Sequence, residues 1–458
     1  MNYRFCLAST NAFCFSVCLS LSIITAAHAG ESEATQSDQL TQSGAAPLPS
    51  PLTLDYVMQT LTQTHPDLVM AQSYIELSNS KLLKADSAYG FRAYLLGEAR
   101  YIEPPAIAPD QSRDDSRVRL IVGKRIYDFG RTANAEKAAQ ADVKSSEWLY
   151  QNTLNQYRIA VMESFFDVLL ADLQYIRDNE AMSIAFIDYD RTKTRNELGQ
   201  RSDIQVLETQ STYQKVRRQL YTSRSSQRNT RSKLANILNR PGELVAEIAE
   251  PDLPNLKRPV PEVEDLQAKA LKDNPLLIAL RAQVEAAAKR VSSARAGYRP
   301  TLDGSAEVGK YVREMGNYNE WEASLILNVP LLNGGKVKAE VAQQQAELMR
   351  LKAELQNAEM DVQQAVLDNW QLLGTLAAEQ EEMKALLDYR DLYLDRSRAL
   401  YEMEVKTDLG DSMTQVSDAR LKIAETKFNT ALAWARLDAL VGNKVYAVEE
   451  NPAKENNQ

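Results

Sequence analysis

Apolar residues follow a helical spacing over most of the chain, in long stretches that contain little Gly or Pro. The two longest stretches run over about 131–195 and 335–400, and as helices each would be on the order of 100 Å long. In the second stretch, apolar residues recur every seven positions in two seams: Val341, Leu348, Leu355 and Val362 beside Leu351, Ala358, Ala365 and Leu372. This a/d pattern predicts packing against a neighbouring helix as in a coiled coil.

A second kind of pattern interrupts the helices. Four segments of about ten residues alternate with a period of two: 91–101, 117–126, 302–312 and 321–329. One face of each segment is apolar and the other carries polar or charged residues, such as Arg117 and Arg119. Their length matches a tilted membrane strand, and the alternation is typical of a barrel wall with lipid outside and water inside. Two soluble hairpins with one face on a core give the same alternation.

The order of these elements occurs twice. His65-Pro66 lies 209 residues before Asn274-Pro275, and Ser202-Asp203 lies 205 residues before Thr407-Asp408. We therefore expect a duplicated unit of helix, β-hairpin and long helical hairpin. The predicted domains are a first repeat at 52–240, a linker at 241–261 and a second repeat at 262–442.

The ends of the chain differ from the repeats. Arg4, the apolar run 13–24 and the sequence Ala27-His28-Ala29 predict a signal peptide over 1–29. Residues 30–51 are rich in Ser, Gln, Thr and Pro and are expected to form a disordered leader, and 443–458 to form a polar tail. All three cysteines (Cys6, Cys14 and Cys18) fall within the predicted signal peptide.

The composition limits the kinds of partner and of catalytic or metal site that the chain can have. A net charge of −9 and a pI of 5.2 argue against nucleic-acid binding. With the signal peptide removed, His65 is the only histidine and no cysteine remains, so we expect no His-based triad, metal site or cofactor. Acidic residues on long helices are usually solvated, and an exported carboxylate-dependent hydrolase is disfavoured. The remaining alternatives are an outer-membrane export duct and a soluble periplasmic coiled-coil scaffold or adaptor.

The number of strands bears on assembly. Four strands cannot close a barrel, and open strand edges are not tolerated in lipid. If the strands span a membrane, several chains must share one barrel.

These features together resemble the TolC-type outer-membrane efflux protein family. The resemblance rests on the duplicated unit and on weak motifs in the right order: Asn274-Pro275, the helix-to-strand junction 294–300, the strand-to-helix junction 329–335 and the Leu198-Gly199 turn. It implies a homotrimer with a twelve-stranded β-barrel in the outer membrane and a periplasmic α-helical barrel. It also implies a passive duct for efflux or type I secretion, which works with a periplasmic adaptor and an inner-membrane ABC or proton-driven transporter.

The chain departs from the family pattern at several positions. His65 stands where the second repeat has Asn274, Phe91 where it has Pro300, and Glu404 where a Gly is usual. Gly410 and Met413 occupy positions where some members carry Asp.

Three groups of residues are candidates for functional or structural roles. Gly130, Gly334 and Gly335 are expected where strands turn into helices, and Pro300 where a helix turns into a strand. The turn formed by Leu198, Gly199, Gln200 and Arg201 is the candidate docking site for the adaptor; a solvated turn without a partner is the alternative.

Asp203, Asp408 and Asp411 are the candidate periplasmic gate. In a trimer they would form acidic rings that attract cations. Helix capping is the alternative, because Ser202-Asp203-Ile204-Gln205 fits a capping box.

Overall fold

The computed structural model describes residues 48–61, 65–253, 256, 258–313, 318–403 and 409–446. The predicted signal peptide, the leader up to residue 47 and the tail from residue 447 therefore lie outside the described residues. Among the described helices, none is both long enough and apolar enough to cross a membrane.

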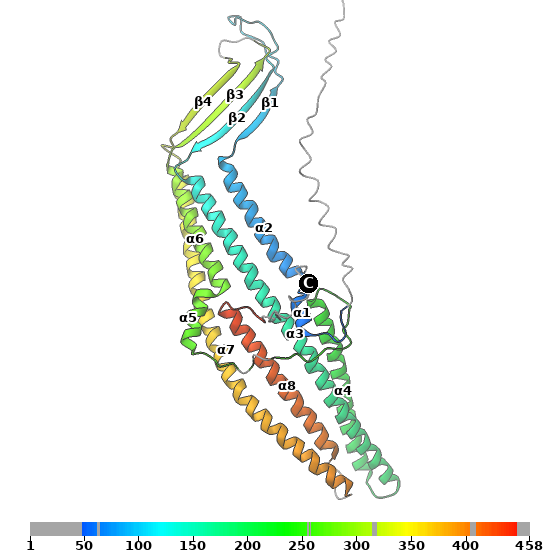
Figure 1. The fold of residues 1–458 in the computed structure, drawn as a ribbon. Coiled ribbons are helices and arrows are strands. Elements are labelled where there is room, and N and C mark those ends of the chain that lie inside the picture. Colours follow the sequence, from blue (N-terminus) through cyan, green and yellow to red (C-terminus); the bar gives the residue numbers. More distant parts are fainter. Residues whose placement is uncertain are drawn as a thin grey trace, which may run out of the picture. The chain divides into compact units, whose positions relative to one another are not determined.

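In the first repeat, the shorter helices α1 and α2 come before a pair of strands, and the longer helices α3 and α4 come after it (Figure 1). Its elements are α1 (Leu54–Gln59), α2 (Pro66–Asp86), the 3-10 turn η2 (Ser87–Tyr89), β1 (Arg92–Glu98), β2 (Arg117–Tyr127), α3 (Arg131–Glu197) and α4 (Asp203–Ile237).

The second repeat contains the same elements in the same order. They are α5 (Val263–Asp273), α6 (Pro275–Arg295), η4 (Ala296–Tyr298), β3 (Thr301–Tyr311), β4 (Trp321–Asn328), α7 (Lys336–Glu402) and α8 (Leu409–Leu440). The predicted fold class, mainly helical with a small β portion and a duplicated unit, is confirmed. The long helices α3 and α7 contain 67 residues each.

The helices α2 and α6, which lead into the strands of each repeat, start in the same way. Pro66 and Pro275 occupy the first helical position, where a missing backbone N–H costs nothing. The N-cap side chains differ in chemistry but not in role: His65 Nδ1 accepts the Asp67 N–H at 3.3 Å, and Asn274 Oδ1 accepts the Leu277 N–H at 3.1 Å. His65, the departure from the family pattern, is thus a helix cap.

The four strands form one antiparallel sheet in the order β1-β2-β3-β4. The two hairpins join through β2 and β3, with Arg119 opposite Gly309 and Val122 opposite Ala306. β1 and β4 are the edge strands, and neither has a second partner within the described residues. The register shifts between Arg125 and Tyr127, where β2 leads toward α3.

The two larger apolar cores of the described residues lie among the helices, and α8 contributes to both. Phe428 of α8 stacks on Phe166 of α3 with ring centroids 4.5 Å apart, in a cluster that also contains Phe165. Trp434 and Leu437, further along α8, pack against α5, α6 and α7 in the second cluster. Because one face of α8 packs against each repeat, α8 joins the two repeats.

Equivalent helices of the two repeats pack against different numbers of long helices. The helices α6 and α8 of the second repeat each pack against both α3 and α7. Their counterparts in the first repeat, α2 and α4, pack substantially only against α3 among the long helices described. In consequence α2 exposes apolar side chains that a second neighbour would cover: Val69, Met70, Tyr74, Leu77 and Leu83.

The heptad seam predicted for α7 is buried or half-buried at seven of its eight positions and fails only at the last, Leu372. Leu351 and Val362 are buried as expected, but Leu372 is 38% exposed while Val366 and Leu373 are buried. A straight helix drifts about 20° per heptad relative to a strict seven-residue repeat. In addition, the partners of α7 change along its length from α5 and α6 to α8.

Candidate functional site

The two faces of the sheet have opposite chemistry. On one face, charged side chains pair across the strands: Arg117 with Glu98, Arg119 with Glu307 and Arg125 with Asp303. The last two pairs have N–O distances of 3.1 Å and 3.0 Å, and both bridge β2 and β3. Because β2 supplies all three arginines, it neutralises acids on both of its neighbours. The acids of β1 and β3 and the arginines of β2 were expected on one face, and they lie there.

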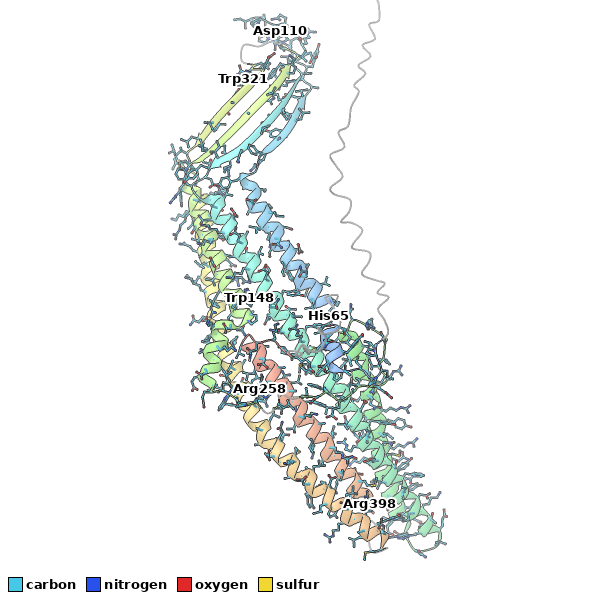
Figure 2. All side chains as sticks on the ribbon, in the orientation of Figure 1. His65, Asp110, Trp148, Arg258, Trp321 and Arg398 are labelled. Atoms are coloured by element: carbon cyan, nitrogen blue, oxygen red, sulfur yellow. The ribbon has the colours of Figure 1, made fainter. Side chains whose placement is uncertain are left out.

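The opposite face is apolar and open. The side chains of Leu95, Leu120, Val308, Leu325 and Leu327 are each at least 46% exposed in the chain. Trp321 begins β4 on this face and is 74% exposed (Figure 2). A contiguous apolar face of this kind marks a surface that lipid or another protein covers.

The loops that follow β1 and β3 are tied to one another. Asp115 is 2% exposed and accepts hydrogen bonds from the Arg100 guanidinium at 2.6 Å and the Tyr318 hydroxyl at 3.1 Å. The Arg313 guanidinium donates to the carbonyl of Asp110, a residue labelled in Figure 2. Side chains of the second hairpin's loop therefore secure the first hairpin's loop.

Asp128 organises the junction from β2 to α3. It is fully buried, and its Oδ2 accepts hydrogen bonds from the Thr132 N–H at 2.9 Å and the Thr132 hydroxyl at 2.5 Å. Its Oδ1 accepts the hydroxyl of Tyr89, from the η2 turn, at 2.6 Å. One carboxylate thus caps α3 and joins the turn that enters the hairpin to the helix that leaves it. Gly130 follows with a φ of 87°, which glycine adopts without strain.

The second junction uses different residues. Gly334 and Gly335 have φ values of 59° and 83°, and Gly335 is the N-cap of α7. Asn333, the counterpart of Asp128, contributes its backbone carbonyl, which accepts the Lys336 N–H at 3.1 Å. Pro300 lies between η4 and β3, where a helix-to-strand junction was expected.

The first hairpin tip lies between α3 and α4. Leu198 is 67% exposed, and Gly199 takes a φ of 73° in the turn. Both halves of the capping box between Ser202 and Gln205 are present, and Asp203 Oδ1 accepts the side-chain amide of Asn196 at 3.0 Å. The capping interpretation of this segment is confirmed, while the docking and gate roles stay predictions.

The second tip is described only in part. Asp408 lies outside the described residues. Asp411 is exposed in the first turn of α8, and Gly410 lies beside it. A Cβ atom at Gly410 would come within 2.8 Å of Ile184 of α3, so glycine allows the start of α8 to approach α3 closely. Only Asp203 and Asp411 of the candidate gate can therefore be placed, each near its own tip.

A polar cluster connects α3 to α8 between the tips and the aromatic core. The Arg177 guanidinium donates to Asp178 at 2.8 Å and to Asp418 at 3.1 Å, and Lys422 pairs with Asp418 at 3.2 Å. Sequence reasoning did not find these residues or Asp128. Arg177 lies within a long polar helix, and its neighbours in the sequence give no indication of its partner. Asp418 lies 241 positions away in the sequence.

Residues 266–443 match the family model described as outer membrane efflux protein. No curated protein sequence matches the chain. Solved structures resemble it at low sequence identity. The outer membrane protein VceC of Vibrio cholerae is 15% identical, with a TM-score of 0.70 over 86% of this chain and 97% of its own.

Two further structures give the same result. The CmeC outer membrane channel of Campylobacter jejuni is 15% identical, with a TM-score of 0.71 over 85% of each chain. A membrane protein of Pseudomonas aeruginosa is 15% identical, with a TM-score of 0.71 over 85% of this chain and 90% of its own. The family model, together with these likenesses, supports the predicted location in the outer membrane. The chain thus has an outer membrane efflux protein domain at residues 266–443 and the fold of outer-membrane efflux channels, which confirms its resemblance to the TolC-type family.

Proposed function

We propose that three copies of this chain form a passive export duct through the outer membrane, extended into the periplasm by the long helices. The observation that carries the proposal is the sheet, which has one open apolar face, one ion-paired face and two edges without partners. Lipid would cover the apolar face, water would fill the other side, and neighbouring chains would satisfy the edges. Three chains of four strands would close a twelve-stranded barrel, as the family resemblance implies.

The helices support the same assembly independently. Each of α6 and α8 packs against both α3 and α7, whereas no second long helix among the described residues packs substantially against α2 or α4. The α7 helix of a second copy, packed against α2 and α4, would supply one. Such an interface joins two different surfaces, so it repeats from copy to copy and gives a ring when the rotation between copies closes.

Apolar side chains on both surfaces fit this arrangement. On α2, Met70 and Tyr74 are 53% and 56% exposed. On α7, Met349 and Leu392 are each 73% exposed, and Tyr389 is 54% exposed. Burial of these side chains would drive association at about 25 cal/mol per Å² of apolar surface.

A duct of this kind supplies no energy. We infer that an inner-membrane transporter, of the ABC or proton-driven type, drives export through a periplasmic adaptor. Our candidate contact for the adaptor is the tip formed by Leu198, Gly199, Gln200 and Arg201. The exposed side chain of Leu198 would be buried against an apolar surface of the adaptor. Replacement of 198–201 by a neutral turn should leave the trimer intact and abolish export. Retained export would reject this contact.

We propose that Asp408 and Asp411 line the narrow periplasmic entrance, with Asp203 contributing chiefly to the capped first turn of α4. Carboxylates repeated by threefold symmetry would attract multivalent cations. In single-channel recordings, replacing Asp408 and Asp411 by Ala should change conductance and weaken block by such cations. Unchanged pores with lower stability would leave capping as the whole role of these residues.

Fractionation tests the central assignment against the scaffold alternative. A duct should be recovered with outer membranes, migrate differently after heating in detergent and form pores in planar bilayers. A soluble periplasmic scaffold would be recovered without membranes and would form no pores.

A further inference from the structure

The ion-paired face of the sheet carries apolar residues that a water-filled lumen does not explain. The strand register places Tyr94, Ile121 and Ile326 on the same face as the arginine pairs. Tyr94 and Ile326 are 55% and 56% exposed. Large apolar side chains exposed to water gain nothing for stability, so a cluster of them beside charges suggests a binding surface.

These side chains border a hollow with a glycine at its floor. Gly123 lies in one register row between Arg92 of β1 and Ser305 of β3. The nearest atom to a Cβ placed at Gly123 is the Gly304 carbonyl oxygen at 3.8 Å, so the space above Gly123 is open. The hollow has a volume of about 220 Å³, and its border includes Arg92, Tyr94, Ile121, Ser305 and Ile326.

The charges at the hollow favour an anion. Arg125 also borders it, but Asp303 neutralises that guanidinium at 3.0 Å. Arg92 is exposed and makes no ion pair with any residue that the structure describes. The Ser305 hydroxyl bonds the Ser324 hydroxyl at 2.7 Å, and one of the two can turn its proton toward a ligand. A guanidinium with a hydroxyl opposite suits a carboxylate or sulfonate.

We propose that this hollow binds organic anions with an apolar body and is a transient site for such molecules on their way through the duct. The anionic group would lie between Arg92 and Ser305, and the apolar body would lie against Tyr94, Ile121 and Ile326. The inference rests on the proposed function, because it requires this face to line a lumen. It names the substrate class as amphiphilic organic anions.

Block of single channels by 2-naphthoate tests the site. Naphthoate should interrupt the current through the reconstituted protein, and the cation 2-naphthylmethylammonium should do so much less. Arg92→Gln should raise the half-blocking concentration of naphthoate about fivefold, as expected for one partly exposed ionic contact. Gly123→Leu, which fills the hollow, should have a similar effect. Lys310→Gln is the matched control, because Lys310 lies on the apolar face and should not affect block.

The possible failures are distinguishable. Pores that naphthoate blocks equally well in Arg92→Gln, or that the cation blocks equally well, would overturn the inference and leave the duct intact. Protein that forms no pores would contradict the proposed function and, with it, the lumen that the inference needs. Saturation-transfer NMR of naphthoate with the detergent-solubilised protein gives a second readout. At one fixed naphthoate concentration, a weaker signal in Arg92→Gln than in the unchanged protein supports the site, and an equal signal rejects it.

Discussion

The two repeats of this protein have the same elements in the same order but different degrees of burial. In the second repeat, α6 buries nine residues and α8 buries thirteen. In the first repeat, α2 and α4 bury three each. The duplication therefore fixes the local structure, while position within the chain decides which surfaces stay open.

The difference in burial between the repeats indicates which helix surfaces of the chain are available for assembly. The contacts between α3 and the helices α6 and α8 join the first repeat to the second within one molecule. The surfaces of α2 and α4 that lack such contacts are the equivalents of surfaces already buried inside the chain. In the proposed trimer, the interface inside the molecule would therefore be repeated between molecules.

The largest expected effect comes from charges placed on the open face of α2. Met70→Glu combined with Leu77→Glu should abolish the trimer and leave helical content unchanged, because both side chains are exposed in the single chain but would be buried in the assembly. Size-exclusion chromatography with light scattering measures the result. Ile107→Glu, at a loop residue that is 92% exposed, is the control and should assemble normally. A trimer of the double variant with wild-type stability would show that α2 is not an interface.

The second prediction concerns the junctions, where the repeats differ in chemistry. Asp128→Ala leaves the Tyr89 and Thr132 donors without a partner and should lower the free energy of unfolding by about 3 kcal/mol. Asn333→Ala, the matched change in the second repeat, should cost less than about 1 kcal/mol, because only a backbone carbonyl of Asn333 bonds there. Denaturant titrations of the solubilised protein compare the two variants. Equal losses would mean that the carboxylate does not hold the first junction.

The third prediction exchanges the residues that end the last helix of each repeat. Asn239 and Gly442 both have positive φ, at 56° and 75°, and each follows a helix whose end closes with the same pattern of backbone hydrogen bonds. A Cβ at Gly442 would come within 2.4 Å of the Asp273 carbonyl oxygen.

Gly442→Asn should therefore cost about 2 kcal/mol, and the reciprocal Asn239→Gly only a few tenths. Thermal denaturation gives both values. A harmless Gly442→Asn would show that α8 and the end of α5 are further apart than the structure places them.

The smallest effect is at Tyr157 of α3, whose counterpart in α7 is Val362. The Tyr157 hydroxyl donates to the Ile237 carbonyl at 2.8 Å, near the end of α4. Burial, with a smaller contribution from Asp67, raises the pKa of Tyr157 from 10.0 to about 12. The folded state holds this proton more tightly than the unfolded state, so the resulting stability is present below pH 10.0 and is lost as the pH rises toward about 12.

Tyr157→Phe should cost about 1 kcal/mol at pH 8 and reduce the loss of stability between pH 10 and 12. Melting temperatures measured across that range test it. An unchanged alkaline slope would assign the loss to other groups.

Much of the fold could be predicted from the sequence because its signals are local and occur twice. The change of period from helix to strand, the Pro66 and Pro275 helix starts and the Gly130 and Gly335 junctions each depend on neighbouring residues. Duplication then confirms each signal at a fixed distance. The capping box at Ser202 was readable for the same reason.

Other parts depend on partners that are distant in sequence and could not be predicted. Nothing in the sequence distinguishes Asp128 from the other acidic residues, because its partner Tyr89 is brought next to it only by the fold. The cluster of Arg177 with Asp418 requires knowledge that α3 and α8 are neighbours. The seam of α7 departs from its heptads where the helix changes partners, and the hollow at Gly123 exists only once β1, β2 and β3 are in register.

The central claim is that copies of this chain complete one another in a closed ring of three. The mass of the complex solubilised from outer membranes in nonionic detergent, measured by light scattering with correction for bound detergent, tests it most directly. The account predicts three times the mass of the mature chain. A stable monomeric pore would contradict it, because one chain would then close a barrel with four strands and leave the faces of α2 and α4 uncovered.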